Sequence, residues 1–263
     1  MNKTDLKKYL EQVYNQYKHK HSSKDPVWVL HKFVHERDIE IAGLIVSCFA
    51  YGQVDQINKF TGELFSRTSM NIYEFTANFN EQKDKKFLRG LYYRFNDEKD
   101  LVYLFKNLNR VLKEHGSLKK VFLKHHKNEN ENILDGLTGL VGELRKETQN
   151  KNQKETQNIA SLRYLLPSPE DNSTCKRLNL FMRWMVRKDD IDLGIWKEID
   201  KSKLVMPVDT HIYKVTQKLK MVKRKSCDLK YAVELTNELK EFDADDPVKY
   251  DFALCHVRLD KKF

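Results

Sequence analysis

Apolar residues recur every three or four positions along almost the whole chain, which is the spacing of helices that bury one face. The pattern is clear at 6–17, 101–112 and 178–185. Only 9 glycines and 5 prolines interrupt the 263 residues. An all-β sandwich needs a turn about every 8–12 residues, and these two residue types are too few to supply one. The sequence therefore predicts an all-α protein.

Several helix ends can be placed from capping residues. Asp25-Pro26 combines an N-cap with a proline suited to the first helical position. Residues 39–51 are apolar nearly all round, which predicts a buried central helix that Gly52 ends. Further helix ends are expected at Asn96-Asp97, Gly116, Ser117, Asp228 and Asp246-Pro247, and the last three helices at roughly 210–220, 228–241 and 246–258.

The cysteines and the apolar runs exclude several classes of protein. Four cysteines lie far apart, at 48, 175, 227 and 255, with no C-x-x-C pair to hold a zinc ribbon or an iron–sulfur cluster. The amino terminus lacks the apolar region of a signal peptide. The longest apolar run, 41–52, is shorter than the about 20 residues of a membrane span. We expect a cytoplasmic monomer, nucleoid-associated if it binds DNA, without a membrane partner, metal or other cofactor.

The formal net charge of +10 comes from 48 Lys+Arg against 38 Asp+Glu. The total alone leaves two interpretations open, a polyanionic partner or merely solvated helix surfaces. Much of the charge falls in two runs, 176–188 and 214–225, on either side of Asp209. This placement favours a nucleic-acid partner.

Between 145 and 160 the chain is polar and has no apolar face. The pentapeptide KETQN occurs there twice, at 146–150 and 154–158. Such composition predicts a flexible insertion rather than a repeat architecture.

Two segments combine a loop, a helix start and titratable groups. In the first, Asn172-Ser173-Thr174-Cys175 leads to Lys176 and Arg177 in the first turn of a helix, where free backbone N–H groups attract phosphate. An ordinary basic helix face is the alternative. In the second, Asp209 precedes a helix that starts at Thr210. Its alternative role is a simple N-cap.

The string Pro-Val-Asp-Thr-His-Ile at 207–212, followed by Val215, resembles a segment of the helix-hairpin-helix-GPD DNA glycosylases. These include endonuclease III, the adenine-mismatch glycosylases and the 8-oxoguanine glycosylases. Residues 174–181 look like the end of the family hairpin and its second helix, and 45–51 with 58–61 resemble the early helix pair. A nearer resemblance is to a bacterial branch of unknown function marked by Tyr-Leu-Leu-Pro-Ser-Pro, here 164–169, and Cys-Lys-Arg-Leu-Asn, here 175–179.

The resemblance implies a two-lobed helical fold, with the hairpin-bearing lobe at roughly 53–205 and the other lobe built from 1–52 and 206–263. It implies base-excision repair of double-stranded DNA. A damaged base is flipped out, and its glycosidic bond is cleaved with help from the Asp209 carboxylate. Lys176 takes the nucleophile position of the members that also nick the strand by β-elimination.

Further site residues follow from the same resemblance. Asn172, Ser173, Thr174, Arg177 and His211 are expected to contact DNA, together with Gln53 and a wedge residue, Tyr51. A core tyrosine at a helix end is the alternative for Tyr51. The hairpin segment lacks the family glycines, so a non-catalytic nucleic-acid-binding module that retains the fold stays open. A helical protein–protein scaffold with incidental charge is a third possibility.

Overall fold

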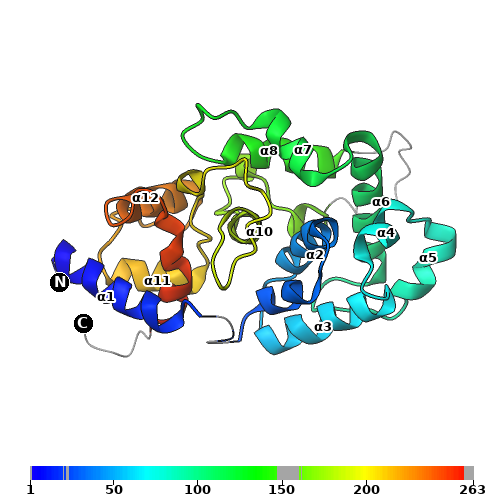
Figure 1. The fold of residues 1–263 in the computed structure, drawn as a ribbon, viewed down its shortest axis with the longest axis horizontal. Helices are drawn as coiled ribbons and strands as arrows, with labels where there is room; N and C mark the ends of the chain where they lie inside the picture. Colours follow the sequence, from blue (N-terminus) through cyan, green and yellow to red (C-terminus); the bar gives the residue numbers. More distant parts are fainter. Residues whose placement is uncertain (1, 20, 22–23, 147–159, 161, 258–263) are drawn as a thin grey trace. The chain divides into compact units, whose positions relative to one another are not determined.

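The computed structural model describes residues 2–19, 21, 24–146, 160 and 162–257. Every regular element in these ranges is helical, apart from two isolated bridges, Tyr93–Asn96 and Lys188–Leu193, so the all-α prediction is confirmed (Figure 1). Most of the predicted insertion at 145–160 lies outside the described residues. Among the described helices, none is both long and apolar enough to traverse a membrane.

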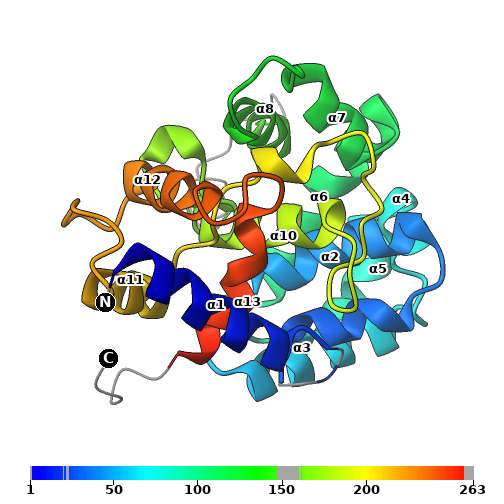
Figure 2. The ribbon, with the colours of Figure 1, turned by 60° about the vertical axis from the view of Figure 1, so that its left-hand side comes forward.

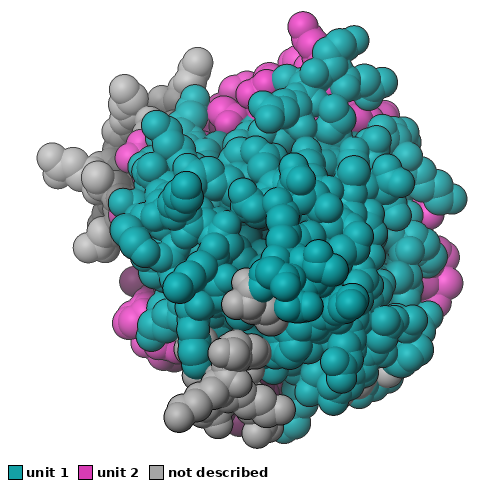
Figure 3. Space-filling model, turned by 90° about the vertical axis from the view of Figure 1, so that its left-hand side faces the viewer, with its two compact units in different colours: residues 1–24, 128–134, 169–263 teal, residues 25–127, 135–168 magenta. Residues whose placement is uncertain are grey.

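The chain divides into two compact units (Figure 3). Unit 1 comprises 1–24, 128–134 and 169–263, and unit 2 comprises 25–127 and 135–168. These boundaries differ from the predicted ones at 52/53 and 205/206. Residues 25–52 group with unit 2 because their helices pack on the helices that follow, and 169–205 group with the carboxy-terminal part of the chain, to which ion pairs bind them.

Unit 2 is built around α2 (Glu36–Cys48), in which every residue from Asp38 to Cys48 is buried. The predicted buried central helix is present, but it begins at Glu36 and ends at Cys48, before the predicted end at Gly52. Element η1 packs on α2 and α3, and α2 packs on α4. Helix α6 packs on α4, α5 and α7. The other elements are η1 (Pro26–Lys32), α3 (Val54–Arg67), α4 (Ile72–Ala77), α5 (Glu81–Leu88), α6 (Glu98–His115), α7 (Leu118–His125) and α8 (Leu134–Arg145).

Two buried carboxylates on α2 satisfy the starts of neighbouring helices. Glu40 accepts the backbone N–H groups of Leu118 and Lys119 at 3.0 and 3.1 Å, in the first turn of α7. Asp38 accepts the N–H of Tyr73 at 2.8 Å in α4. The first N–H groups of a helix have no partner within it and carry partial positive charge. These contacts explain how a central helix holds two buried acidic residues.

Unit 1 contains the two ends of the described chain. Helix α1 (Lys3–Tyr17) runs beside α13 (Tyr250–His256), as Figure 2 shows. Lys249 bonds to Glu11 at 3.0 Å, and the hydroxyl of Tyr250 donates to the same carboxylate. The remaining elements are η2 (Pro169–Asp171), α10 (Lys176–Val186), η3 (Lys201–Lys203), α11 (Thr210–Lys218), α12 (Leu229–Lys240) and η4 (Pro247–Lys249).

The helix ends test the capping predictions. Asp97, Ser117 and Asp228 cap helices with their side chains, and Gly116 ends α6 in the left-handed conformation, with φ at 83°. Asp25 caps a 3-10 helix rather than an α-helix. Asp246 makes no capping bond, contrary to the prediction, because its carboxylate binds Arg187 instead. Two short helices, α4 and α5, were not predicted.

Glycines on α8 allow close packing against α7, and this yields a test of the fold. A Cβ atom on Gly139 would lie 2.1 Å from Cγ of His125, whereas one on Gly142 would meet nothing within 4 Å. We expect Gly139→Ala to destabilise the protein, because overpacking costs about 1–3 kcal/mol. Gly142→Ala should stabilise it by about 0.5–1 kcal/mol through helix propensity alone. The free energies of unfolding in urea check both. Equal effects of the two variants would contradict this packing.

Candidate functional site

The structure brings Lys176 and Asp209 together in unit 1. Lys176 is the first residue of α10 and Asp209 is the N-cap of α11, and Nζ lies 4.0 Å from Oδ2. The side chains are 26% and 40% exposed. Both groups therefore reach solvent, where a substrate can approach them.

The local fold fixes the orientation of the Asp209 carboxylate. Its Oδ1 accepts the N–H groups of His211 and Ile212, both at 2.9 Å, as an N-cap does. The flanking Val208 and Ile212 are fully buried and anchor the segment. Both capping bonds use Oδ1, which leaves Oδ2 directed to the ammonium group of Lys176. Capping and a chemical role are thus compatible in one side chain.

The turn before α10 forms without glycine. Asn172 and Cys175 adopt left-handed backbone conformations, with φ at 53° and 50°. Ser173 accepts the N–H of Cys175 through its hydroxyl at 3.2 Å, and the carbonyl of Thr174 accepts from the buried Asn179 at 3.0 Å. Asparagine tolerates this conformation, whereas most residues pay roughly 1–2 kcal/mol for it. Helix α10 then begins without a side-chain cap.

The other residues predicted to bind DNA are spread over both units. Arg177 and His211 are half-buried in the first turns of α10 and α11. Gln53, in unit 2, is exposed and is the N-cap of α3 without a side-chain capping bond. Their DNA-binding roles stay predictions.

Tyr51, also in unit 2, belongs to an aromatic cluster. Its hydroxyl donates to Asn96 at 2.6 Å, and its ring meets those of Tyr93 and Tyr164 edge-on at 5.1 and 5.5 Å. The guanidinium of Arg94 lies 5.8 Å from the same ring centroid. These contacts hold Tyr51 in place, half-buried in the loop that follows the central helix. A wedge role for it remains a prediction.

The basic run at 176–188 does not form the ordinary basic helix face that was the alternative interpretation of this segment. Arg183 and Arg187 are buried, with side chains 3% and 6% exposed, and they form ion pairs inside unit 1. Arg183 donates hydrogen bonds to Asp192, at 3.1 Å, and to Asp251. Arg187 donates one to Asp192 and two, at 2.8 and 3.1 Å, to the two carboxylate oxygens of Asp246. The acidic partners come from outside the run, so inspection of 172–188 alone could not reveal them.

Burial sets the protonation behaviour of this ion network. It raises the pKa of Asp192 to about 6, although the charges of Arg183 and Arg187 pull in the opposite direction. Burial tends to lower the pKa of Arg187, but the charges of Asp192 and Asp246 raise it well above its usual value. Removing the charged groups of this network from water therefore costs considerable free energy, which the ion pairs offset.

Asp251 joins the network to the candidate catalytic pair. Burial raises the pKa of this carboxyl, Arg183 and Lys176 lower it, and the negative charge of Asp209 raises it. Asp251 therefore interacts electrostatically with both members of the pair. It lies on α13, far along the sequence and outside any recognisable motif, so sequence patterns alone do not reveal its role.

A surface pocket of about 370 Å³ lies elsewhere in unit 1. It is lined by Lys3, Leu6, residues 218–221, Glu238 and Phe242, and contains neither Lys176 nor Asp209. We place the candidate site at the pair, because the two residues singled out by the sequence motifs, Lys176 and Asp209, meet there.

Comparison with known families identifies the chain over most of its length. Residues 25–260 match the family described as "Protein of unknown function (DUF2400)", and the chain belongs to that family. Comparisons with curated proteins and with solved structures found no match.

The buried network predicts a pH-dependent effect of Arg183→Met. Loss of one partner leaves Asp192 and Asp251 short of compensating charge, which costs about 3–5 kcal/mol of unfolding free energy at neutral pH. A carboxyl whose pKa is raised in the folded state stabilises that state as the pH falls through the raised value, here about 6 for Asp192. The loss measured in urea should therefore be smaller at pH 5 than at pH 7.5. An equal loss at both values would show that these carboxyls do not carry the effect.

Proposed function

We propose that this chain is a DNA glycosylase of the helix-hairpin-helix-GPD type, which excises a damaged base from duplex DNA and nicks the strand. The observation that carries the proposal is the approach of Lys176 Nζ to within 4.0 Å of Asp209 Oδ2. The two residues occupy the matching positions of the family motifs. In the sequence they are separated by a polar stretch, so their approach is a property of the fold.

The chemistry uses both groups on one sugar carbon. Once the base is flipped out of the stack, the carboxylate of Asp209 stabilises the positive charge that develops as the glycosidic bond breaks. The neutral amine of Lys176 forms a bond to C1′ as the base leaves, and opening of the sugar ring yields a Schiff base. Removal of a proton from C2′ then breaks the bond between C3′ and its phosphate oxygen.

The helix starts support these roles electrostatically. Each helix amino terminus carries partial positive charge, which interacts favourably with the negative charge of Asp209 at the start of α11. The same partial charges attract DNA phosphate.

Phosphate contacts would come from a smaller set of cations than the net charge indicates. The charges of Arg183 and Arg187 are neutralised by internal ion pairs, and Arg224 forms an ion pair with Asp228. The exposed lysines of the second run, at 214, 220 and 223, remain available on or after α11. A cytoplasmic location, with access to the chromosome, belongs to this proposal.

Borohydride trapping tests the lyase chemistry. Wild-type protein should form a covalent adduct with at least one member of a panel of duplex oligonucleotides that carry abasic sites or oxidised, deaminated or alkylated bases. Lys176→Ala should form none. Asp209→Asn should slow base release by about 100- to 10 000-fold, because its amide oxygen still caps α11 but carries no charge.

Lys230→Ala provides the matched control, since it removes an exposed lysine from α12 in the same unit. It should trap as wild type does. Absence of any adduct across the panel, or undiminished trapping by Lys176→Ala, would refute the proposal.

The glycine-free turn favours a second candidate, a nucleic-acid-binding module without catalysis. Side chains at Asn172 and Cys175 occupy the left-handed positions that glycine would leave open to a phosphate. In this case Asp209→Asn should leave DNA affinity unchanged, and no base should be released. Fluorescence anisotropy at about 50 and about 200 mM salt measures both the affinity and its electrostatic share. No binding even at low salt would exclude both candidates.

A further inference from the structure

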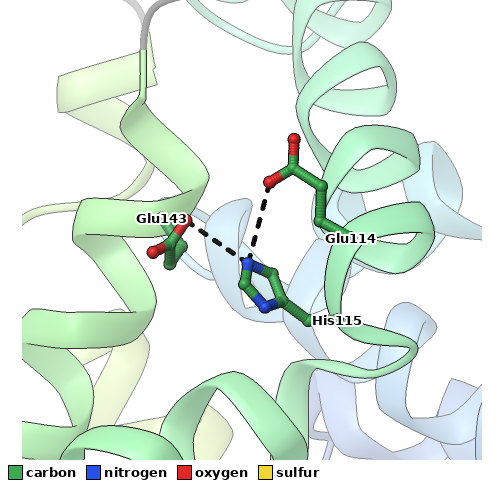
Figure 4. Close-up of side chains that lie close together, drawn as sticks. All are labelled: Glu114, His115 and Glu143. Atoms are coloured by element: carbon green, nitrogen blue, oxygen red, sulfur yellow. Dashed lines mark ion pairs between the residues drawn. The ribbon is translucent and has the colours of Figure 1, made fainter.

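Glu114, His115 and Glu143 converge in unit 2, outside the site described above (Figure 4). Glu114 and His115 are the last two residues of α6, and Glu143 lies in the last turn of α8. One ligand-type atom from each side chain falls within 4.8 Å of the other two. The sequence predicts no metal here, because Glu143 is distant from the Glu-His pair along the chain.

Two buried atoms in this cluster face each other without a hydrogen bond. Nε2 of His115 and Oε2 of Glu143 are both shielded from solvent, and neither has a hydrogen-bond partner among the described residues. They lie 3.4 Å apart, beyond the 2.7–3.2 Å or so of a normal N–H···O bond. The Glu143 side chain is only 8% exposed, so water does not compensate it well. Buried polar atoms without partners are rare and call for an explanation.

The separations suit a bound metal ion. In a tetrahedral zinc site with bonds of about 2.0–2.2 Å, neighbouring ligand atoms lie about 3.3–3.6 Å apart. Nε2 of His115 is 3.4 Å from Oε2 of Glu143 and 3.7 Å from Oε2 of Glu114. The Glu114 side chain is 48% exposed and has room for the small adjustment that the third contact needs.

The surrounding electrostatics also favour a cation. Carboxyl ends of helices carry partial negative charge, so carboxylates in the last turns of α6 and α8 are unfavourable unless a cation offsets them. Arg110 contacts Oε2 of Glu114 at 3.1 Å, and Lys146 contacts Oε1 of Glu143 at 2.6 Å. Lys146 contacts only Oε1, and the other oxygen of Glu143, Oε2, faces Nε2 of His115 at 3.4 Å.

We propose that Glu114, His115 and Glu143 bind a divalent transition-metal ion of the Zn²⁺ class, which links the end of α6 to the end of α8. One imidazole and two carboxylates form a nitrogen–oxygen donor set that suits Zn²⁺ better than Mg²⁺ or Ca²⁺. Three protein ligands leave a fourth position for water. The site is independent of the proposed glycosylase function, since it lies wholly within unit 2.

Isothermal titration of the tag-free, chelator-treated full chain with ZnSO₄ tests the proposal. We expect one saturable site whose occupation raises the thermal unfolding temperature. A titration in the Cys227→Ser/Cys255→Ser background excludes the two exposed thiols as ligands. His115→Ala should weaken binding by more than about 100-fold, because loss of a direct ligand exceeds the cost of losing an outer partner. The exposed Glu114→Gln, which leaves the fold intact, should abolish the thermal shift.

Two further variants make the test specific. His35→Ala removes an exposed histidine elsewhere in unit 2 and should bind as wild type does. Lys146→Ala removes a cation that competes for Glu143 and should tighten binding. Absence of saturable one-to-one binding, or unchanged affinity in both His115→Ala and Glu114→Gln, would overturn the proposal.

Discussion

A buried network of ion pairs between two arginines of α10 and its C-cap and three aspartates holds the candidate site together. Asp251, Arg183, Asp192, Arg187 and Asp246 alternate in sign, and each guanidinium bonds to two carboxylates. Removing such groups from water is costly, and only close pairing with several hydrogen bonds offsets the cost. The network therefore tolerates few alternative arrangements of α10, the loop after it and α13. Lys176 begins the helix that these pairs position, so its approach to Asp209 depends on charges that never meet a substrate.

Local signals in the sequence predicted much of the fold, because helix periodicity and capping act over a few residues. Asp97, Ser117 and Gly116 lie at the ends that the sequence indicates, and the apolar stretch at 39–51 became the buried α2. Helix α4 was missed because it has only six residues and no side-chain cap, and α5 because it buries a single residue, Leu88, and so shows no apolar periodicity. The capping prediction failed at Asp246, where a distant arginine competed successfully for the same oxygens.

The residues of the candidate site likewise fall into those that the sequence indicates and those that only the structure reveals. The pair Lys176 and Asp209 was accessible to sequence comparison because each residue lies in a short, recognisable string. Asp251 and Asp192 were not, since their importance comes from burial and from partners on other elements. The polar stretch after α10 carries no recognisable motif in the sequence. In the structure its backbone N–H groups at Leu193 and Gly194 bond to the carbonyl of Trp184 near the end of α10, and it supplies Asp192. Polar composition alone does not distinguish a solvated loop from one built around a buried ion.

The ends of helices explain why the two proposed sites have opposite character. At the starts of α10 and α11 the free N–H groups create positive potential, which stabilises the Asp209 carboxylate and suits a phosphate-bearing substrate. At the ends of α6 and α8 the free carbonyl groups create negative potential, and two glutamates and a histidine gather there. The net charge of +10 specifies neither site. What decides their chemistry is which end of a helix each titratable group occupies and whether an ion pair has already neutralised it.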